Sequence, residues 1–296
     1  MTTASSGRRW PNSSRKAMAD AWVRNPSDET RIRYRDDGGP GLPVLVLGGF
    51  LDPIEIVART PVVAALPRDA LRLIWVDHRG HGASDAPHEP SAYAIERRVG
   101  DVLAVLDDLG IERAGIMGIS WGGRLGFGVA DRAPPRVRSL VSIGQHPYEL
   151  RADGPLGRVL AGAMDATVTQ GISAIVEAFE GLAGRYPEEV RAAYLAEDPV
   201  AMRAAWTAAL AEGPVAHDLA SWRIPCCVCV AEGDEDFAAD IRRAADEIPG
   251  ARFVLIERTD HLGVDTVDAG PFLSAVVDTL LAEPPPSTRH GPGPER

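Results

Sequence analysis

The sequence predicts an α/β protein with a mostly parallel central sheet that is flanked by helices. Three observations lead to this prediction. Short apolar segments alternate with helical patterns along most of the chain, a glycine-rich turn joins one apolar segment directly to a helix, and one long segment has helical patterns only. Strands that alternate with helices form a parallel sheet, because each crossover helix returns the chain and covers one face.

Six short apolar segments are the predicted strands. They lie at 44–47, 71–76, 114–117, 137–143, 225–230 and 252–256. A short run of continuous apolar residues is typical of a strand buried on both faces. Helical stretches separate these runs. Residues 91–109, for example, carry apolar side chains at helical spacing, and Gly110 ends the pattern.

The same patterns divide the chain into four parts. Residues 1–27 are basic and rich in serine, and we expect a flexible N-terminal extension; Met18 is a candidate start. Residues 28–147 and 223–283 form the α/β core, and residues 148–222, which are helical throughout, form a cap over the strand ends. Residues 284–296 begin with three prolines and are expected to be a disordered tail.

Composition excludes several classes of function. The formal net charge of −11 and the pI of about 5.1 argue against a nucleic-acid partner, because phosphates would be repelled. Cys226, Cys227 and Cys229 crowd into one apolar run and predict buried strand residues, with neither a disulfide framework nor a zinc site. No apolar run is long enough to span a bilayer and none follows the N-terminal arginines, so a cytoplasmic protein is expected, with no membrane partner.

The residues 118–122 carry the strongest chemical signal. Gly118-Ile119-Ser120-Trp121-Gly122 joins the predicted strand at 114–117 to a helical segment, and this is the context in which Gly-x-Ser-x-Gly forms a nucleophile turn. So sharp a turn needs glycine two residues before and two residues after the serine. The helix N-terminus then faces the serine and favours a developing oxyanion. We therefore expect Ser120 to be a catalytic nucleophile.

A serine needs a base to remove its proton. Among seven histidines, His261 alone follows the last predicted strand, where a parallel sheet places its ligand crevice. His78 and His81 have a spacing that suggests a metal, but no acidic partner is in position, so neither a metal nor a cofactor is expected. The base needs a carboxylate to orient it. The segment 231–236 follows the cysteine-rich strand and offers four acids, and spacing alone leaves the choice among them open.

Several stretches between 31 and 281 resemble the α/β-hydrolase family. They are Leu47-Gly48-Gly49-Phe50, which resembles the oxyanion loop; 77–85, which resembles the Asp-x-Arg-Gly-x-Gly-x-Ser turn; 101–110, which resembles the helix before the nucleophile strand; the nucleophile turn; and Gly233-x-x-Asp236. The resemblance implies the α/β-hydrolase fold, with a helical cap inserted after the sixth strand. It implies Asp236 as the catalytic acid, and the backbone N–H groups of Phe50 and Trp121 as the oxyanion hole.

The sequence departs from the family pattern at two positions. Gly48 stands where histidine is usual in the oxyanion loop, and Asp260 stands where glycine usually precedes the catalytic histidine. Asp260 either adds a charge beside the base or bonds the loop backbone, as aspartate often does in turns. Ser120 also separates the chain from the haloalkane dehalogenases and epoxide hydrolases that it resembles, because those enzymes use aspartate at this position.

Together these features predict a serine hydrolase that cleaves a carboxylic ester or lactone of a small to medium apolar molecule through an acyl-enzyme. Two alternatives remain: a carbon–carbon bond hydrolase or lyase on the same fold, and a non-catalytic homologue that binds a small molecule. His146, Trp206 and Phe179 are candidates for the substrate pocket. The substrate and the oligomeric state stay open, because the shared machinery of a fold does not identify either.

Overall fold

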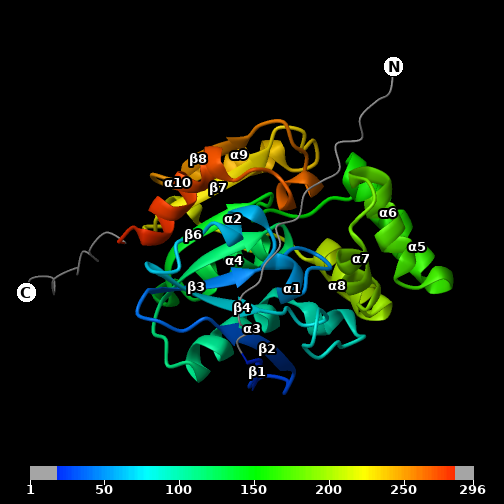
Figure 1. The fold of residues 1–296 in the computed structure, drawn as a ribbon, viewed down its shortest axis with the longest axis horizontal. Helices are drawn as coiled ribbons and strands as arrows, with labels where there is room; N and C mark the ends of the chain where they lie inside the picture. The colour runs from blue at the N-terminus through cyan, green and yellow to red at the C-terminus, as the bar shows by residue number, and fades with distance from the viewer. Residues whose placement is uncertain (1–18, 284–296) are drawn as a thin grey trace, which may run out of the picture.

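The computed structural model describes residues 19–283, and its centre is one eight-stranded sheet (Figure 1). The strand order is β1-β2-β4-β3-β5-β6-β7-β8. The first two strands run antiparallel to their neighbours, and all later pairs are parallel. The strands are β1 (Ala21–Arg24), β2 (Arg31–Asp36), β3 (Leu42–Leu47), β4 (Leu71–Val76), β5 (Ala114–Ile119), β6 (Val137–Ile143), β7 (Cys226–Ala231) and β8 (Arg252–Ile256).

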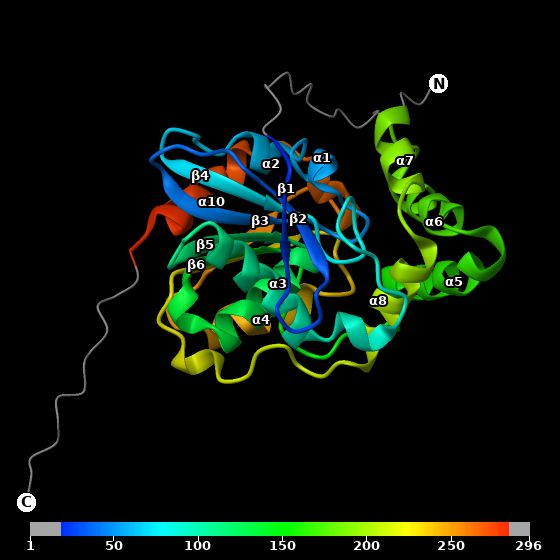
Figure 2. The same cartoon turned by 90° about the horizontal axis from the view of Figure 1, so that it is seen from below.

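Helices cover both faces of the sheet, as Figure 2 shows from below. One face packs against α3 (Ile95–Asp108), α4 (Trp121–Arg132) and α9 (Ala238–Glu247). The opposite face packs against α1 (Ile54–Val57), α2 (Pro61–Ala64) and α10 (Gly270–Leu281). The strands are therefore buried on both sides, which explains their continuous apolar character.

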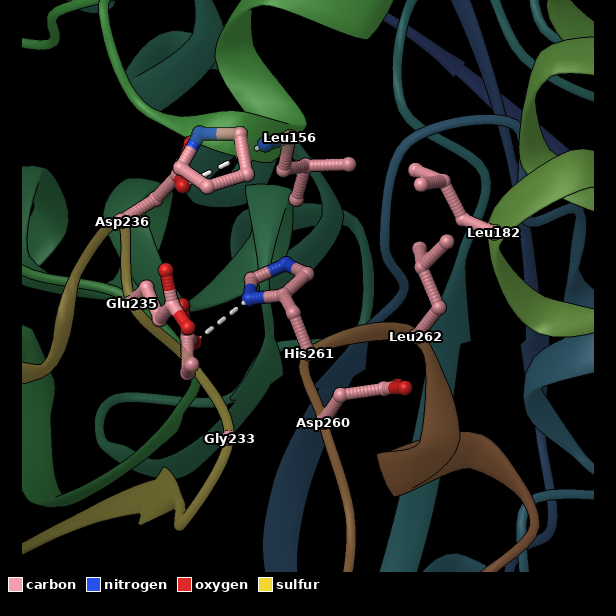
Figure 3. Close-up of a pocket in the computed structure, with 10 residues that line it drawn as sticks. Leu156, Leu182, Gly233, Glu235, Asp236, Asp260, His261 and Leu262 are labelled. Atoms are coloured by element: carbon pink, nitrogen blue, oxygen red, sulfur yellow. Dashed lines mark hydrogen bonds and ion pairs between the residues drawn. The ribbon is translucent and has the colours of Figure 1, made fainter.

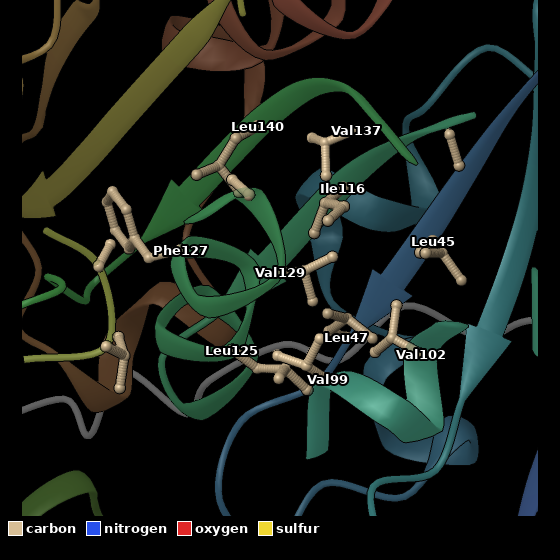
Figure 4. Packing of buried hydrophobic residues seen from close by; sticks show 14 of the residues in the cluster. Leu45, Leu47, Val99, Val102, Ile116, Leu125, Phe127, Val129, Val137 and Leu140 are labelled. Carbon is tan, nitrogen blue, oxygen red and sulfur yellow. The ribbon is translucent and has the colours of Figure 1, made fainter. Parts of the chain in front are cut away.

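The larger of the two cores shows how the central strands are fixed (Figure 4). Leu45 and Leu47 of β3, Ile116 of β5 and Leu140 of β6 point to the side on which α3 and α4 lie, and all are at most 1% exposed. Because β5 is held between two layers of packed side chains, its carboxyl end, where Ser120 follows, is a rigid position.

Four helices between β6 and β7 form the cap, which lies beside the carboxyl ends of the strands (Figures 1 and 2). They are α5 (Pro155–Gln170), α6 (Ser173–Ala183), α7 (Glu188–Leu195) and α8 (Pro199–Ala211). Buried residues of α5, α6 and α7 pack with Leu51 and Ile56 of the core, so the cap has its own apolar contacts with the loops beneath it. The cap follows the sixth strand, as expected.

The N-terminal boundary is the main correction to the expected organisation. Residues 1–27 were expected to be an extension, but Ala21–Arg24 form β1 and pair with β2. The strand alternates half-buried and exposed residues at the edge of the sheet, so its sequence lacks the apolar run that marks the central strands. Residues 1–18 and the expected tail at 284–296 lie outside the described residues. Within residues 19–283 no helix is long and apolar enough to cross a membrane.

Candidate active site

Ser120 sits in a strained turn between β5 and α4. Its φ of 45° and ψ of −111° are unusual for a residue with a side chain, and such strain is typical of functional sites. A Cβ at Gly118 would lie 2.3 Å from the Gly122 carbonyl oxygen, and a Cβ at Gly122 would lie 2.3 Å from the Leu47 carbonyl oxygen. Both glycines are therefore required by space, as the sequence predicted.

His261 lies in hydrogen-bonding distance of Ser120. The Ser120 Oγ and His261 Nε2 atoms are 2.9 Å apart. On the other side of the ring, His261 Nδ1 is 2.8 Å from a carboxylate oxygen of Asp234, whose side chain is 1% exposed. With the ring proton on Nδ1 donated to Asp234, Nε2 is left to accept the serine proton. The three side chains thus form a continuous relay from a buried carboxylate to a hydroxyl.

The structure places Asp234 against His261, and not Asp236, which the sequence predicted as the acid. Asp236 does not contact His261; its carboxylate accepts hydrogen bonds from the backbone N–H groups of Leu156 and Gly157, at 3.3 and 2.8 Å. These N–H groups belong to the first turn of α5, so Asp236 caps that helix and ties it to the core. Figure 3 shows Asp236 directed toward Leu156, while the bond from His261 runs to the other side of the same loop.

The turn after β7 explains why Asp234, and not Asp236, reaches His261. The Asp234 N–H donates to the carbonyl of Ala231, which ends β7, and the Gly233 N–H donates to Thr259 in the histidine loop. The chain therefore turns at once toward the histidine loop, and the first aspartate after the glycine reaches His261. The motif Gly233-x-x-Asp236 has a spacing two residues longer, so it pointed to Asp236.

Two backbone donors are available beside Ser120. Among the described residues, neither the Phe50 N–H nor the Trp121 N–H donates a hydrogen bond to the protein, and Trp121 is the first residue of α4. Phe50 lines the same cavity as Ser120. Both residues expected to form an oxyanion hole thus lie next to Ser120, one along the cavity wall and one along the chain, and the oxyanion hole stays a prediction.

His78 supports the oxyanion loop at the position where the sequence lacks the usual histidine. Its Nε2 atom lies 2.9 Å from the Gly48 carbonyl oxygen, which also accepts from the Gly122 N–H. A Cβ at Gly48 would lie 2.4 Å from the Val57 Cγ2 atom, so a side chain there would have to displace Val57. Burial lowers the pKa of His78 to about 4, which keeps the imidazole neutral. Sequence reasoning considered His78 only as a metal ligand and missed this contact.

A cavity of about 50 Å³ adjoins Ser120, and we call it the Ser120 cavity. Its walls are Gly49, Phe50, Asp52, Ile119, Ser120, Leu156, Leu160, Phe179, Tyr186, Tyr194, His261 and Leu262. Of the three expected pocket residues, only Phe179 lines it. Trp206 packs against the Phe50 ring, and His146 lines a separate polar cavity together with Phe237 and Asp240.

Asp52 and Tyr194 form a hydrogen-bonded pair in this cavity that sequence reasoning did not predict. The Tyr194 hydroxyl, from α7, donates to the Asp52 carboxylate at 2.7 Å. Burial raises the pKa of the Asp52 carboxyl to about 6. Asp52 follows the strand β3 at the crevice edge, and that position was a usable signal. The Tyr194 contact depends on how the cap docks, which no local pattern reveals.

A second cavity of about 200 Å³ lies on the outer side of His261, and we call it the outer cavity (Figure 3). Leu156, Leu182 and Leu262 give it an apolar wall, and Asp236 and Asp260 lie at its rim. Asp260 accepts a hydrogen bond from the Gly263 N–H at 2.7 Å, and its side chain turns away from the imidazole ring (Figure 3). Of the two roles expected for Asp260, this contact supports a hydrogen bond to the loop backbone over a charge beside the base.

No group of three or more His, Cys, Asp or Glu side chains between residues 19 and 283 is arranged to hold a metal ion. Cys226, Cys227 and Cys229 are free and buried on β7, as their apolar surroundings predicted.

Known proteins resemble this chain in sequence and in structure. Residues 43–170 match the α/β hydrolase fold family. The chain is 35% identical over 108 residues to epoxide hydrolase 2 of Siraitia grosvenorii, over 36% of this chain and 34% of that protein. The matched stretch thus spans only about a third of that curated relative.

Two solved structures are similar over nearly the whole fold. One is the enol-lactonase from Burkholderia xenovorans LB400, with a TM-score of 0.73 and 26% identity over 86% of this chain and 98% of that chain. The other is the bottromycin epimerase BotH in complex with bottromycin A2, with a TM-score of 0.70 and 26% identity over 87% of this chain and 96% of that chain.

Proposed function

We propose that this chain, which has the α/β-hydrolase fold, is a serine hydrolase that cleaves a carboxylic ester or lactone through an acyl-enzyme. The observation that carries the proposal is the relay from Asp234 through His261 to Ser120, with bonds of 2.8 and 2.9 Å. Such a relay activates a hydroxyl for attack on a carbonyl carbon. The similarity to an enol-lactonase supports an ester-type bond as the target.

The first step forms the acyl-enzyme. His261 Nε2 takes the proton of Ser120 as the Oγ atom attacks the carbonyl carbon, and the carbonyl oxygen becomes an oxyanion. The N–H groups of Phe50 and Trp121 donate to that oxyanion, helped by the N-terminal end of α4. His261 then passes the proton to the leaving oxygen, and the carbon–oxygen bond of the ester breaks.

The second step releases the acid. A water gives its proton to His261 Nε2 and attacks the acyl carbon, and Ser120 recovers its proton when the tetrahedral intermediate collapses. In both steps the Asp234 carboxylate holds the imidazole in the required tautomer and stabilises the imidazolium. For a lactone the leaving oxygen stays attached to the acyl chain, so one hydroxy acid is the product.

The two cavities suggest how a substrate divides between them. The Ser120 cavity lies on the side of the oxyanion loop and is small and mostly apolar, which suits a short acyl chain. The outer cavity is larger and borders His261, which delivers the proton to the leaving group. We therefore assign the acyl chain to the Ser120 cavity and the leaving group to the outer cavity.

A panel of aryl esters and lactones tests the proposal. Wild-type protein should hydrolyse at least the short-chain aryl esters, and Ser120→Ala should lower kcat by about 10⁶ with its circular dichroism spectrum unchanged. Turnover of a diketone with no turnover of any ester or lactone would favour carbon–carbon bond cleavage. Tight binding of a small molecule with no turnover of any substrate would favour the non-catalytic alternative.

A further inference from the structure

Asp52 is a buried carboxyl group that the proposed mechanism does not use. It follows Leu51 in the loop after β3, is 6% exposed, and lines the Ser120 cavity together with Ser120 and His261. The neighbouring wall consists largely of apolar side chains, among them Ile119, Leu160 and Phe179. A carboxyl group in such a wall costs free energy unless a partner compensates it.

The backbone of residues 49–52 places the Asp52 carboxyl group close to Ser120. Leu51 has a φ of 73°, a left-handed conformation that costs about 1 kcal/mol or more for a residue with a side chain. Gly49 has no side chain, and a Cβ there would lie 2.7 Å from the Asp52 Oδ2 atom and 3.7 Å from the Ser120 Cβ atom. The absence of that side chain leaves Asp52 facing the same small space as the nucleophile.

The protein donates fewer hydrogen bonds to the Asp52 carboxylate than this group can accept. Tyr194 donates to Oδ1 at 2.7 Å, and the Gly49 N–H donates to Oδ2 at 3.0 Å. An ionised carboxylate can accept about four hydrogen bonds. Within residues 19–283 no arginine, lysine or histidine forms an ion pair with Asp52, and no cation lowers its pKa, which burial raises to about 6. At neutral pH the group is therefore mostly ionised and still able to accept a donor.

We propose that Asp52 is a specificity-determining residue that accepts a hydrogen bond from the acyl part of the substrate, so that the favoured substrate carries a hydroxyl or ammonium group a few atoms from its carbonyl carbon. The inference rests on the proposed acyl-enzyme function, because the acyl chain reaches Asp52 only when its carbonyl is at Ser120. The cavity of about 50 Å³ restricts such a chain to a short one.

Three phenyl esters of nearly equal shape test the inference. Phenyl 3-hydroxybutyrate presents a donor, phenyl 3-methylbutyrate places a methyl group at the same position, and phenyl 3-aminobutyrate presents an ammonium group. For wild-type protein the kcat/KM ratio of the hydroxy ester or the amino ester to the methyl ester should be about tenfold or more. The larger of the two ratios identifies the donor.

Two substitutions of Asp52 and one control complete the experiment. Asp52→Leu removes every acceptor and should bring both ratios to about one, and Asp52→Asn removes the charge and should reduce mainly the ammonium ratio. Glu197→Gln is the matched control, because Glu197 is also a buried carboxyl but does not line the Ser120 cavity. It should leave both ratios as in wild type. Labelling of Ser120 by a fluorophosphonate verifies that each variant is folded.

The results separate a role in recognition from a role in structure alone. If Asp52 only anchors Tyr194 and the loop, Asp52→Leu will slow all three esters equally and the ratios will not change. That outcome, or ratios of about one in wild-type protein, would overturn the inference while ester hydrolysis still stands.

A binding measurement tests Asp52 when no ester is turned over, in which case the proposed function fails. Calorimetry then compares 3-hydroxybutyramide, 3-aminobutyramide and 3-methylbutyramide on Ser120→Ala protein. Tighter binding of a donor-bearing amide that Asp52→Leu abolishes would support Asp52 as a recognition residue. Equal binding of the three amides would contradict it.

Discussion

At the scale of single residues, two aspartates two positions apart perform different tasks. Asp234 contacts the imidazole of His261, whereas Asp236 caps the first turn of α5. In the proposed reaction the first contact affects a proton that moves, whereas the second contact attaches the cap to the core. Substitution of each by asparagine, which has nearly the same shape, separates the two tasks.

Asp234→Asn should lower kcat by about 10⁴, because an amide in this position favours the wrong tautomer of His261. The substitution keeps the shape of the side chain, so the melting temperature should change little. Steady-state kinetics on a short-chain aryl ester measure the effect. A loss of less than tenfold would mean that Asp234 does not orient the base.

Asp236→Asn is the control for that experiment and has its own expected outcome. Its kcat should fall by less than tenfold. The amide keeps only one of the two acceptor oxygens, and the lost hydrogen bond to α5 should cost about 1 kcal/mol of unfolding free energy. Chemical denaturation measures this cost. If Asp236→Asn proves the more damaging to kcat, the relay described here is assigned to the wrong carboxylate.

His78→Ala should reduce kcat by at most about fivefold and leave KM nearly unchanged. The hydrogen bond from His78 to the Gly48 carbonyl helps to hold the loop that carries the Phe50 N–H, and a lost hydrogen bond of this kind is worth about 1 kcal/mol. The Gly122 N–H still holds the same carbonyl, so the loss should be partial. A raised KM with an unchanged kcat would contradict this role.

Residues whose position is set by their own turn or strand were predictable from sequence. Residues whose contacts depend on how the cap packs on the core were not. Ser120 is recognisable because its turn requires glycine at 118 and 122, and the structure shows both requirements. His261 is recognisable by its place after the last strand. Asp234 and Asp236 share one loop, and only the path of the turn toward Thr259 decides between them. Tyr194 reaches Asp52 from a different element altogether.

At the scale of elements, the turn between α7 and α8 attaches the cap to the core. The Glu197 carboxylate in this turn accepts a hydrogen bond from the Gly82 N–H with both oxygens, at 3.0 and 3.1 Å. Glu197 is 7% exposed. Burial raises the pKa of its carboxyl to about 8, and the nearby carboxyls of Asp77 and Asp52 act in the same direction.

This raised pKa makes the stability of the protein depend on pH. Between the ordinary pKa of 4.5 and about 8, the folded state keeps a proton on Glu197 that the unfolded state has released. The stability that Glu197 contributes is therefore complete below pH 4.5 and is lost as the pH rises through about 8. Glu197→Gln cannot ionise and should avoid this loss.

The melting temperature of Glu197→Gln minus that of wild-type protein should accordingly increase between pH 6 and pH 9. Thermal denaturation at several pH values measures the difference, and Asp69→Asn, at an exposed carboxylate, is the control. A difference that stays constant over this range would show that Glu197 is already ionised in the folded protein at pH 6.

The first strand shows which elements a sequence pattern fails to reveal. The central strands have two buried faces and are continuous in apolar character, so their positions were predicted closely. β1 lies at the sheet edge with alternate residues exposed, and its stability comes from contacts distant in sequence. The Asn25 side chain, just after β1, donates to the buried carboxylate of Asp101 in α3 at 2.7 Å.

At the scale of the whole molecule, β1 closes one edge of the sheet and joins it to α3. A chain that begins at Asp28, the start of the core expected from sequence, lacks β1 and leaves Asp101 without the Asn25 donor. Removal of one partner from a buried polar group costs about 1–3 kcal/mol. A chain that begins at Met18 keeps all of these contacts.

We therefore expect the chain that begins at Asp28 to melt at least about 5 °C below the chain that begins at Met18. Differential scanning calorimetry of the two proteins, side by side with the full chain, measures the difference. Equal melting temperatures for the two shortened chains would mean that β1 contributes little to the stability of the sheet.

Residues of both the core and the cap line the cavity at Ser120, the proposed nucleophile. The most direct test is the intact mass of the protein after treatment with a fluorophosphonate, followed by peptide mapping. Wild-type protein should gain one phosphonyl group on Ser120, Asp234→Asn should gain it far more slowly, and Ser120→Ala should gain none. Labelling of Ser120→Ala at the wild-type rate, or no labelling of folded wild-type protein, would contradict the account.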